Sequence, residues 1–349
     1  MNTEYVPVNP QSPDSGVIAR AAAIIRDGGL VAFPTETVYG LGADATWSRA
    51  VLRIYEAKAR DLSDPLIVHL AEAAQVLDYA SGLPPLARSL AERFWPGPLT
   101  IVLERGPLLA PEVSGGRSSV AIRVPSHPVA QALLRAAGRP IAAPSANRFM
   151  RTSATTAVHV RDDLDGRIDM ILDGGPATGG LESTVVAIEG EDVRILRPGA
   201  VTAEALAAAA AEFGSAVAFG PASDPGASPG TMAKHYAPTA PLIYISGDPA
   251  TSAQRLREAM AEALARGQSV GALITDAERG GLQELAGRAF FGSVGPADAP
   301  ERVGHQLFRA LRDLDSQRPD VIFARTMGTG GLWVAIDDRL RRAATTVLT

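Results

Sequence analysis

A stretch rich in proline and glycine two thirds of the way along the chain most constrains how it can fold. Residues 219–241 read FGPASDPGASPGTMAKHYAPTAP, in which proline, glycine, serine and alanine dominate. Such a composition does not sustain a regular helix or strand and is typical of a linker or a functional loop. The stretch therefore divides the 349 residues into two folding units, as a chain of this length also suggests.

The two parts differ in how strands and helices follow one another. Before the stretch they are mixed without strict alternation, which predicts an α/β fold with a mixed, twisted sheet and flanking helices. After it, strands alternate with helices, which predicts a smaller three-layer α/β domain around a parallel sheet. We place the first domain at 10–217, the linker at 218–241 and the second domain at 242–349. The first strand–helix turn of the second domain, SGDPA, lacks the G-x-G-x-x-G fingerprint, so no dinucleotide cofactor is predicted.

Apolar periodicity, capping residues and turn residues predict the individual elements. Helices are expected at 16–27, 48–60, 71–80, 85–94, 127–137, 202–213, 251–266, 279–287, 300–314 and 331–342. Strands are expected at 30–33, 66–70, 99–104, 119–125, 140–144, 169–173, 183–188, 193–199, 242–246, 269–275 and 320–325.

Composition excludes several classes of site. The chain has no cysteine, which excludes disulfides, thiolate nucleophiles and zinc–thiolate sites. Its five histidines are scattered without an H-x-x-x-H pair, which argues against a dedicated transition-metal site. A polar N-terminus and the lack of any run of about 20 apolar residues indicate a cytoplasmic protein without membrane spans. The net charge of −5 argues against strong nucleic-acid binding.

Lysine is rare in this chain. Only Lys58 and Lys234 are lysines among 33 basic residues, so both are candidates for sites that need a compact ammonium group. Lys58 stands two residues before Arg60 at the end of an expected helix, and such a pair suits a polyanion such as a triphosphate. The alternative is a cationic last turn that interacts favourably with the helix dipole.

Hydroxyl groups and glycines are concentrated in PTETVYGLGADA, residues 34–45. An extended backbone would send the side chains of Thr35, Thr37 and Tyr39 to one face, and glycines let a ligand approach the backbone closely. The segment is therefore a candidate ligand site, with an ordinary polar turn as the alternative.

Several other polar residues interrupt apolar strands. Arg123 lies inside SVAIRVP, and a buried guanidinium needs an anionic partner, either a protein carboxylate or a ligand. The same holds for Arg197, whereas His69 in LIVHL is either a hydrogen-bonded core residue or a site residue. PSAN (144–147) and ESTV (182–185) offer small polar groups that can form a cradle for phosphate or a base. Neither a G-x-S-x-G elbow nor a P-loop is present.

Taken in order, these segments resemble the YrdC-type threonylcarbamoyl-AMP synthase family. The resemblance rests on PTETVYGLGADA, K-x-R with DPLIVH, SVAIRVP, PSAN, ESTVV and RPG, and it spans about residues 15 to 215. The linker SPGTMAKHYAPTAPL and the α/β domain after it are similar to the two-domain branch. The resemblance implies a YrdC-like sheet followed by a Rossmann-like domain.

The family's activity is the condensation of L-threonine, bicarbonate and ATP to L-threonylcarbamoyladenylate with release of pyrophosphate. A separate transferase complex then uses the product to modify an adenosine next to the anticodon of certain tRNAs. The resemblance implies that threonine is held by Thr37, His69, Arg123 and Ser183. It implies that ATP is held by Lys58, Arg60, Ser119, Ser145, Asn147, Ser153, Arg197 and Tyr236. Lys58 and Arg60 would be the catalytic cations, Tyr236 would act as a lid over the nucleotide, and Mg²⁺ would accompany ATP.

The chain departs from the family pattern K-x-R-P-x-x-N-P-L at two positions. Asp61 replaces the proline and Asp64 replaces the asparagine. An ionised Asp64 would repel phosphate unless a metal ion or Arg60 lies between them.

Two other functions are weighed against the synthase. A carbamoyl-adenylating module that uses carbamoyl phosphate is disfavoured, because such modules usually belong to larger chains with zinc-finger and acylphosphatase segments. An RNA-binding or ribosome-maturation protein is disfavoured by the acidic balance of charge.

Overall fold

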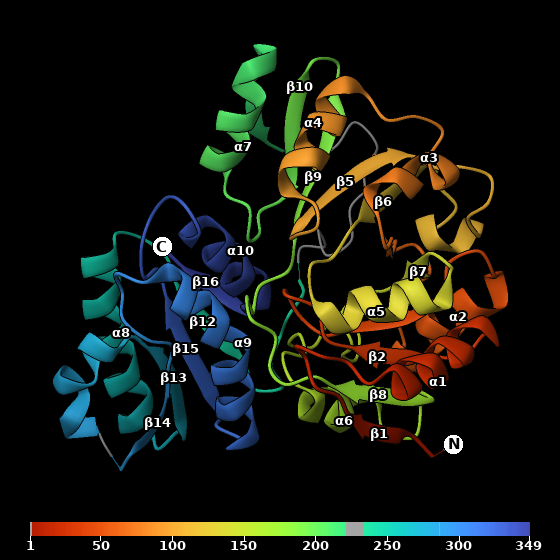
Figure 1. The fold of residues 1–349 in the computed structure, drawn as a ribbon. Helices are drawn as coiled ribbons and strands as arrows, with labels where there is room; N and C mark the ends of the chain where they lie inside the picture. The colour runs from red at the N-terminus through yellow and green to blue at the C-terminus, as the bar shows by residue number, and fades with distance from the viewer. Residues whose placement is uncertain (1, 221–233, 286) are drawn as a thin grey trace. The chain divides into compact units, whose positions relative to one another are not determined.

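The computed structural model describes residues 2–220, 234–285 and 287–349 (Figure 1). The chain forms two compact units. The first contains residues 2–149, 153–178 and 182–220, and the second contains 150–152, 179–181 and the described residues from 234 onward. Most of the expected linker, residues 221–233, lies outside the described residues.

The first unit is built on a mixed sheet, as predicted. Parallel pairs such as β4 with β6 stand beside antiparallel pairs such as β5 with β6. The order across the sheet is β1 (Glu4–Pro7), β8 (Met170–Asp173), β2 (Val31–Phe33), β3 (Gly40–Asp44), β7 (Ile141–Ala142), β4 (Ile67–His69), β6 (Ser119–Arg123), β5 (Leu99–Glu104), β9 (Thr184–Glu189), β10 (Asp192–Arg197) and β11 (Val217–Phe219).

Helices cover both faces of this sheet, because successive strand residues point to opposite sides. Val31 and Phe33 of β2 join the apolar cluster formed with two helices that lie side by side in Figure 1, α1 (Ser15–Arg26) and α5 (Pro128–Ala137). Ala32 between them joins the cluster on the other face. That face is covered by α2 (Ser48–Lys58), α4 (Pro85–Phe94), α6 (Ala157–Leu164) and α7 (Ala203–Ala210).

The second unit is a three-layer α/β domain around a parallel sheet, also as predicted. Its strand order is β14 (Ala289–Ser293), β13 (Val270–Ile274), β15 (Val321–Arg325), β12 (Leu242–Ile245) and β16 (Thr346–Leu348). Helix α8 (Pro249–Ala265) covers one face, where Ala272 and Phe323 are buried. Helices α9 (Pro300–Ser316) and α10 (Trp333–Ala343) contact each other, and α9 reaches the opposite face beside Gly271.

Three sequence predictions of local structure are corrected. The described residues of the helix expected at 279–287 form no α-helix, and short 3₁₀ turns at Asp276–Glu278 and Gly280–Leu285 are found in this part of the chain. Gly280, Gly281 and Gly287 explain this, because glycine disfavours helix by about 1 kcal/mol per residue relative to alanine. The helix expected at 71–80 is divided into a 3₁₀ turn, Ala73–Gln75, and α3 (Val76–Tyr79). Finally, residues 34–39 form an irregular loop instead of extended backbone.

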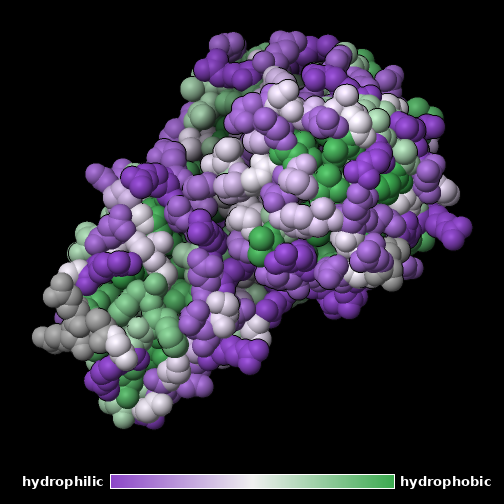
Figure 2. Space-filling view, turned by 60° about the horizontal axis from the view of Figure 1, so that its bottom comes forward, coloured by the Kyte–Doolittle hydropathy of each residue, from purple (hydrophilic) through white to green (hydrophobic). Residues whose placement is uncertain are grey.

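Hydrophilic side chains cover much of the face drawn in Figure 2, and apolar ones show in smaller areas between them. The longest helices, α8 and α9, have 17 residues each. Among the described residues, no helix is long and apolar enough to cross a membrane.

Candidate active site

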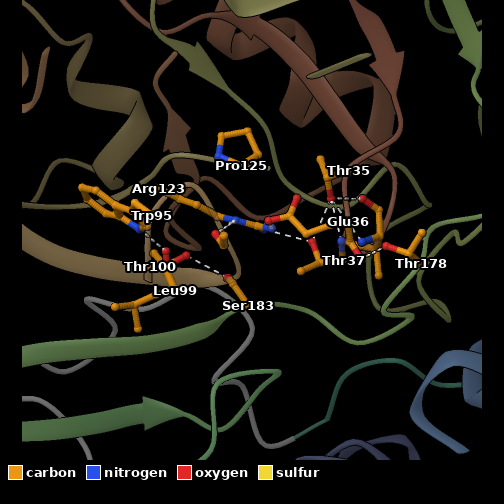
Figure 3. Close-up of polar contacts among 12 residues, drawn as sticks. Thr35, Glu36, Thr37, Trp95, Leu99, Thr100, Arg123, Pro125, Thr178 and Ser183 are labelled. Carbon is orange, nitrogen blue, oxygen red and sulfur yellow. Dashed lines mark hydrogen bonds and ion pairs between the residues drawn. The ribbon is translucent and has the colours of Figure 1, made fainter. Parts of the chain in front are cut away.

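Four neighbouring strands bring polar side chains to one edge of the large sheet. His69 ends β4 and pairs with Arg123, which ends the parallel strand β6. Strand β5 runs antiparallel to β6 and parallel to β9, so its residue Thr100 and the residue before β9, Ser183, lie at the same edge (Figure 3). The sheet therefore gathers three of the four residues predicted to hold threonine.

Three contacts hold the Arg123 guanidinium at this edge. Its Nη2 lies 2.7 Å from Glu36 Oε1, its Nη1 donates to Thr37 Oγ1 at 2.9 Å, and its Nε donates to the carbonyl oxygen of Gly97 at 3.1 Å (Figure 3). Thr37 Oγ1 also hydrogen bonds with Thr35 Oγ1 at 2.8 Å. Of the two partners considered for a buried arginine, the protein carboxylate is present.

Glu36 is held in its charged form by this arrangement. Burial raises the pKa of the Glu36 carboxyl, but the Arg123 guanidinium together with backbone hydrogen bonds from Glu36 and Ser126 keeps the pKa below its usual range. The site edge thus carries a buried anion and a buried cation in direct contact.

His69 is neutral in this site. It is buried, and burial together with the nearby Arg123 charge lowers the pKa of the imidazole to about 3. Its Nδ1 lies 3.2 Å from the carbonyl oxygen of Ile67, and its ring meets Phe33 edge-on with centroids 6.4 Å apart. His69 therefore offers a hydrogen-bonding group instead of a positive charge.

Ser183 joins two further residues at this edge. Its hydroxyl hydrogen bonds with Thr100 Oγ1 at 2.8 Å and accepts from Arg197 Nη2 at 3.1 Å. Arg197 Nη2 also donates to the Ser183 carbonyl oxygen at 2.9 Å. A Cβ on Gly199 would lie 2.4 Å from the nitrogen of Thr184, so the RPG turn can lie against the EST segment only with glycine at this position.

Ser153 approaches the same segment from another loop. Its hydroxyl donates to Glu182 Oε1 at 2.5 Å, and both residues are buried. Ser153 is thereby held against Glu182, the residue that precedes Ser183 in the chain.

The residues predicted to hold the phosphates form a second group. Lys58 is buried at the end of α2, and its Nζ donates to the carbonyl oxygen of Ser145 at 2.6 Å and to that of Asn147. The nitrogen of Phe149 in turn donates to the Lys58 carbonyl at 2.9 Å. The end of the helix and the loop after β7 are therefore joined through Lys58.

Arg60 lies beyond the end of α2. Ala59 adopts a left-handed conformation with φ of 53°, so the helix ends at Lys58, two residues before the end expected at residue 60. Arg60 Nη2 lies 2.9 Å from Asp64 Oδ2, and both side chains are almost completely buried. Arg60 also stacks over Phe149, with 5.7 Å from guanidinium to ring centroid. The Asp64 carboxylate is thus paired with Arg60. A phosphate can lie near an ionised Asp64 only if a metal ion or Arg60 lies between them, and the second condition can be met here.

The two groups lie close together in the first unit. Strand β4 has only three residues, so its ends are about 7 Å apart. The loop before β3 links the two groups, because Thr37 contacts Arg123 while Gly40 bridges to Ser145. Ser119 starts β6 at the end away from Arg123, on the side of the second group.

Tyr236 belongs to the second unit. Its ring is buried, stacks on Phe308 with centroids 5.6 Å apart, and lies 5.1 Å from the Arg339 guanidinium. Thr152 Oγ1 donates to its carbonyl oxygen at 3.2 Å. These contacts all lie within the second unit, and a contact of Tyr236 with nucleotide stays a prediction.

Sequence reasoning missed three polar residues of the site, Glu36, Thr100 and Glu182. A signal for Glu36 was present, since it stands between Thr35 and Thr37 in a candidate segment and a buried Arg123 needs a carboxylate. Glu182 opens the ESTV motif, whereas Thr100 lies in an apolar strand without a distinguishing pattern.

Comparisons with known proteins agree with this architecture. Residues 23–199 match a family described as "Telomere recombination", which unites Sua5, YciO and YrdC, and residues 201–345 match "Threonylcarbamoyl-AMP synthase, C-terminal domain". The threonylcarbamoyl-AMP synthase of Bacillus subtilis is 43% identical over 328 residues, which cover 94% of this chain and 92% of that protein. The enzyme of the same name from Pyrococcus abyssi is 40% identical over 325 residues, 93% of each.

The chain belongs to the Sua5/YrdC family. The crystal structure of P. abyssi Sua5 complexed with L-threonine superposes with a TM-score of 0.88 at 37% identity, over 99% of each chain. Both halves of this Sua5/YrdC protein therefore have counterparts in one solved relative, and the two-domain arrangement expected from the sequence resemblance is confirmed.

Proposed function

We propose that this chain is an L-threonylcarbamoyladenylate synthase that condenses L-threonine, bicarbonate and ATP and releases pyrophosphate. The observation that carries the proposal is the buried pair of Arg123 and Glu36 at the sheet edge, in a chain that matches threonylcarbamoyl-AMP synthases over nearly its whole length.

The pair suits a free amino acid. A zwitterion carries a carboxylate, which a guanidinium such as that of Arg123 binds strongly, and an ammonium group, for which Glu36 provides the opposite charge. The hydroxyls of Thr37 and Ser183 offer hydrogen bonds to the side-chain hydroxyl of threonine. His69 is neutral, so it adds no repulsion toward the ammonium group.

The second group suits the phosphates of ATP. Lys58 and Arg60 supply two cations, and the loop they hold carries Ser145 and Asn147. Ser119, Ser153 and Arg197 are further proposed ATP contacts. Because the loop before β3 contacts Arg123 through Thr37 and bridges to Ser145 through Gly40, an α-phosphate held by the second group would come within reach of an amino acid held by the first.

The reaction needs positioning more than a covalent protein nucleophile. The ammonium group of threonine first releases a proton to solvent, and the neutral amine then attacks the carbon of bicarbonate. A second amine proton leaves with the expelled hydroxide as water, which gives a carbamate. A carbamate oxygen then attacks the α-phosphorus of ATP, and pyrophosphate leaves. Both reactants in the second step are anions, so buried cations and exclusion of water lower the barrier.

Magnesium is proposed to enter with ATP. Within the described ranges, no cluster of three or more His, Asp or Glu side chains has the geometry of a metal site. Glu36 and Asp64 are each paired with an arginine, so the phosphates of ATP and water molecules would supply most of the ligands, since Mg²⁺ retains several waters when it binds substrate phosphates. The ion would neutralise phosphate charge during transfer.

Three further features complete the proposal. Tyr236 acts as a lid over the nucleotide and excludes water from the carbamate. The product is a reactive mixed anhydride, so a transferase complex that modifies a tRNA adenosine must consume it quickly. We place these steps in the cytoplasm.

Pyrophosphate release tests the proposal when ATP and bicarbonate are supplied with each amino acid in turn. Threonine is expected to give turnover, and serine to be at least about tenfold poorer, because one missing methyl group is worth roughly 10–200-fold in a fitted pocket. Equal rates with serine would contradict the assigned pocket. Tight tRNA binding with a steep dependence on salt and no ATP turnover would instead favour the RNA-binding function.

A further inference from the structure

The second unit contains a cleft whose lining includes none of the residues proposed to bind threonine or ATP. It has a volume of about 390 Å³ and is lined by the residues after β12 and β15 and by one side of α10. This volume falls within the range of about 300–1,000 Å³ that accommodates cofactor-sized ligands. It is much larger than an inorganic anion or a single amino acid requires.

The cleft lies where the topology of a parallel sheet predicts a ligand site. Strands β12 and β15 are parallel neighbours, and Ile245 at the end of one pairs with Arg325 at the end of the other. After β12 the chain passes through α8 to β13, whereas after β15 it passes through α10 to β16 on the other side. The two connections thus leave in opposite directions. Crevices at such points, outside the carboxyl ends of the strands, are the usual ligand sites of open α/β sheets.

The two connecting helices lie on opposite faces, which keeps the crevice open. Ile245 is buried in the apolar cluster with α8. The preceding residue, Tyr244, points to the other face, where its hydroxyl hydrogen bonds with Asp337 of α10. The same hydroxyl lies 2.7 Å from Thr326 Oγ1, so both strand ends and α10 are joined at the floor of the cleft.

Arg341 forms the charged wall of the cleft. Its Nε donates to Asp337 Oδ2 at 2.5 Å, its Nη2 donates to Ser246 Oγ at 2.5 Å, and its guanidinium lies 5.2 Å from the ring centroid of Tyr244. Its side chain is nevertheless 42% exposed. These contacts fix the plane of the guanidinium and use two of its five N–H donors, so the remaining edge can bind an oxyanion from solution.

A glycine-rich loop that leads to an aromatic side chain also lines the cleft. Residues 326–331 read TMGTGG and lead into α10. A Cβ on Gly328 would lie 2.4 Å from the Trp333 ring, so the indole packs directly on the glycine backbone. Glycines allow a ligand to approach the main chain, and Thr329 adds an exposed hydroxyl.

We propose that this cleft binds a phosphate ester of the size of a nucleoside monophosphate. The Arg341 edge and the glycine-rich loop would hold the phosphate, Asp337 would accept hydrogen bonds from sugar hydroxyls, and Trp333 would contact the base. The absence of a G-x-G-x-x-G turn after β12 excludes only the dinucleotide mode of binding. The proposal does not depend on the reaction proposed for the first unit.

Helix α10 also contacts the segment that carries Tyr236. Trp333, Asp337 and Arg341 repeat every four residues along the side that lines the cleft. From other positions of the same helix, the Arg339 guanidinium lies over the Tyr236 ring and the Arg342 carbonyl accepts from the nitrogen of His235 at 2.9 Å. A ligand that stabilises α10 therefore also stabilises the conformation of residues 235–236.

Trp333 provides a local reporter. The chain has three tryptophans, so the substitutions Trp47→Phe and Trp95→Phe leave Trp333 as the only one in the full-length protein. We expect AMP to change its emission saturably, with adenosine and inorganic phosphate each binding at least tenfold more weakly. No change at millimolar AMP, or an equal response to L-threonine, would overturn the proposal.

Two substitutions in the protein that keeps only Trp333 test whether AMP changes the emission by binding in the cleft. Arg341→Gln and Thr329→Glu should each weaken AMP binding at least tenfold. Arg309→Gln should not, although Arg309 forms a similar i,i+4 ion pair with Asp313 in the same unit. Unaltered binding in both cleft variants would overturn the site. Hydrogen exchange at the His235 amide should slow when AMP is added, and an unchanged rate would overturn the coupling to the linker.

Discussion

Arg123 and Glu36 form a buried ion pair in which Nη2 and Oε1 are 2.7 Å apart, although 86 residues separate them in the chain. Removing one member of such a pair leaves an uncompensated buried charge, which typically costs about 3–5 kcal/mol. We therefore expect Arg123→Met and Glu36→Gln each to lower the free energy of unfolding, because the carboxylate or the guanidinium that remains is buried without its charged partner. Urea denaturation measures both.

The double variant separates the ion pair from other effects of each substitution. When both charges are removed, no buried charge is left unpaired, so the loss in unfolding free energy should be smaller than the sum of the two single losses. A strictly additive result would contradict the electrostatic account of this edge.

Asp64 replaces the asparagine usual in the family and pairs with Arg60 at 2.9 Å. Asp64→Asn keeps a hydrogen-bond acceptor for Arg60 and removes a negative charge beside the proposed phosphate site. A charge interaction of about 1 kcal/mol corresponds to roughly a fivefold change in affinity, so the KM for ATP should fall by about that factor. Steady-state kinetics with varied ATP measure the change.

Asp61→Asn is the matched control. Asp61 is exposed, and its Oδ1 accepts from the nitrogen of Ser63 at 2.8 Å and from its hydroxyl at 2.7 Å, within a surface turn. Its charge is screened by solvent, so the KM for ATP should change less than twofold. If both substitutions lower KM equally, the effect belongs to the net charge of the protein and not to the Arg60 pair.

His69 should make the protein less stable in mild acid. Its pKa is about 3 in the folded protein against an ordinary value of 6.5, so between these values the unfolded chain binds a proton that the folded protein does not. Stability is therefore complete above about pH 6.5 and falls as the pH decreases, by about 1.4 kcal/mol per pH unit. His127, whose pKa burial also lowers, adds to the slope.

Substitution of His69 measures its contribution to the pH dependence of the unfolding free energy. Between pH 5 and 6, His69→Gln should remove about 1.4 kcal/mol per pH unit from the slope of unfolding free energy against pH. Glu36 has its pKa below the usual range, so it contributes little in this window. A slope that is unchanged in the variant would show that His69 is not held neutral by the fold.

Lys58 should not tolerate replacement by arginine. It is buried, and its Nζ donates to two loop carbonyls, those of Ser145 and Asn147. A planar guanidinium is larger and cannot take the place of a compact ammonium between these oxygens. Lys58→Arg should therefore reduce kcat at least about tenfold although the charge is kept. Lys234→Arg, at an exposed position, is the control, and equal activity of the two variants would contradict a specific role for Lys58.

The sequence predicted the elements whose own residues specify them. Strand β5 was expected at 99–104 and spans Leu99–Glu104, because its apolar run is continuous and bounded by turns. Strands β1 and β3 were not expected. Glu4–Pro7 is mostly exposed and becomes a strand by pairing with residues 170–173. Gly40–Asp44 contains two glycines and an aspartate, which disfavour strand, and only tertiary pairing overrides this preference.

The candidate active site, like the fold, could be predicted from local sequence only in part. The sequence identified Arg123 because a buried guanidinium needs a partner, and the structure supplied Glu36 from a distant loop. It placed the end of the helix at residue 60, whereas the left-handed Ala59 ends it at Lys58, and no residue type at position 59 indicated this conformation. The contact between Ser183 and Thr100 depends on the register of β5 with β9, which local sequence does not encode.

Detection of the product tests the proposed function most directly. The protein would be incubated with ATP, Mg²⁺, ¹³C-bicarbonate and either L-threonine or L-serine, and the quenched mixture examined by mass spectrometry. The account predicts an adenylate of threonine that contains one ¹³C atom, formed together with an equal amount of pyrophosphate and far more slowly with serine. No labelled adenylate with threonine, or equal amounts of the threonine and serine adducts, would contradict it.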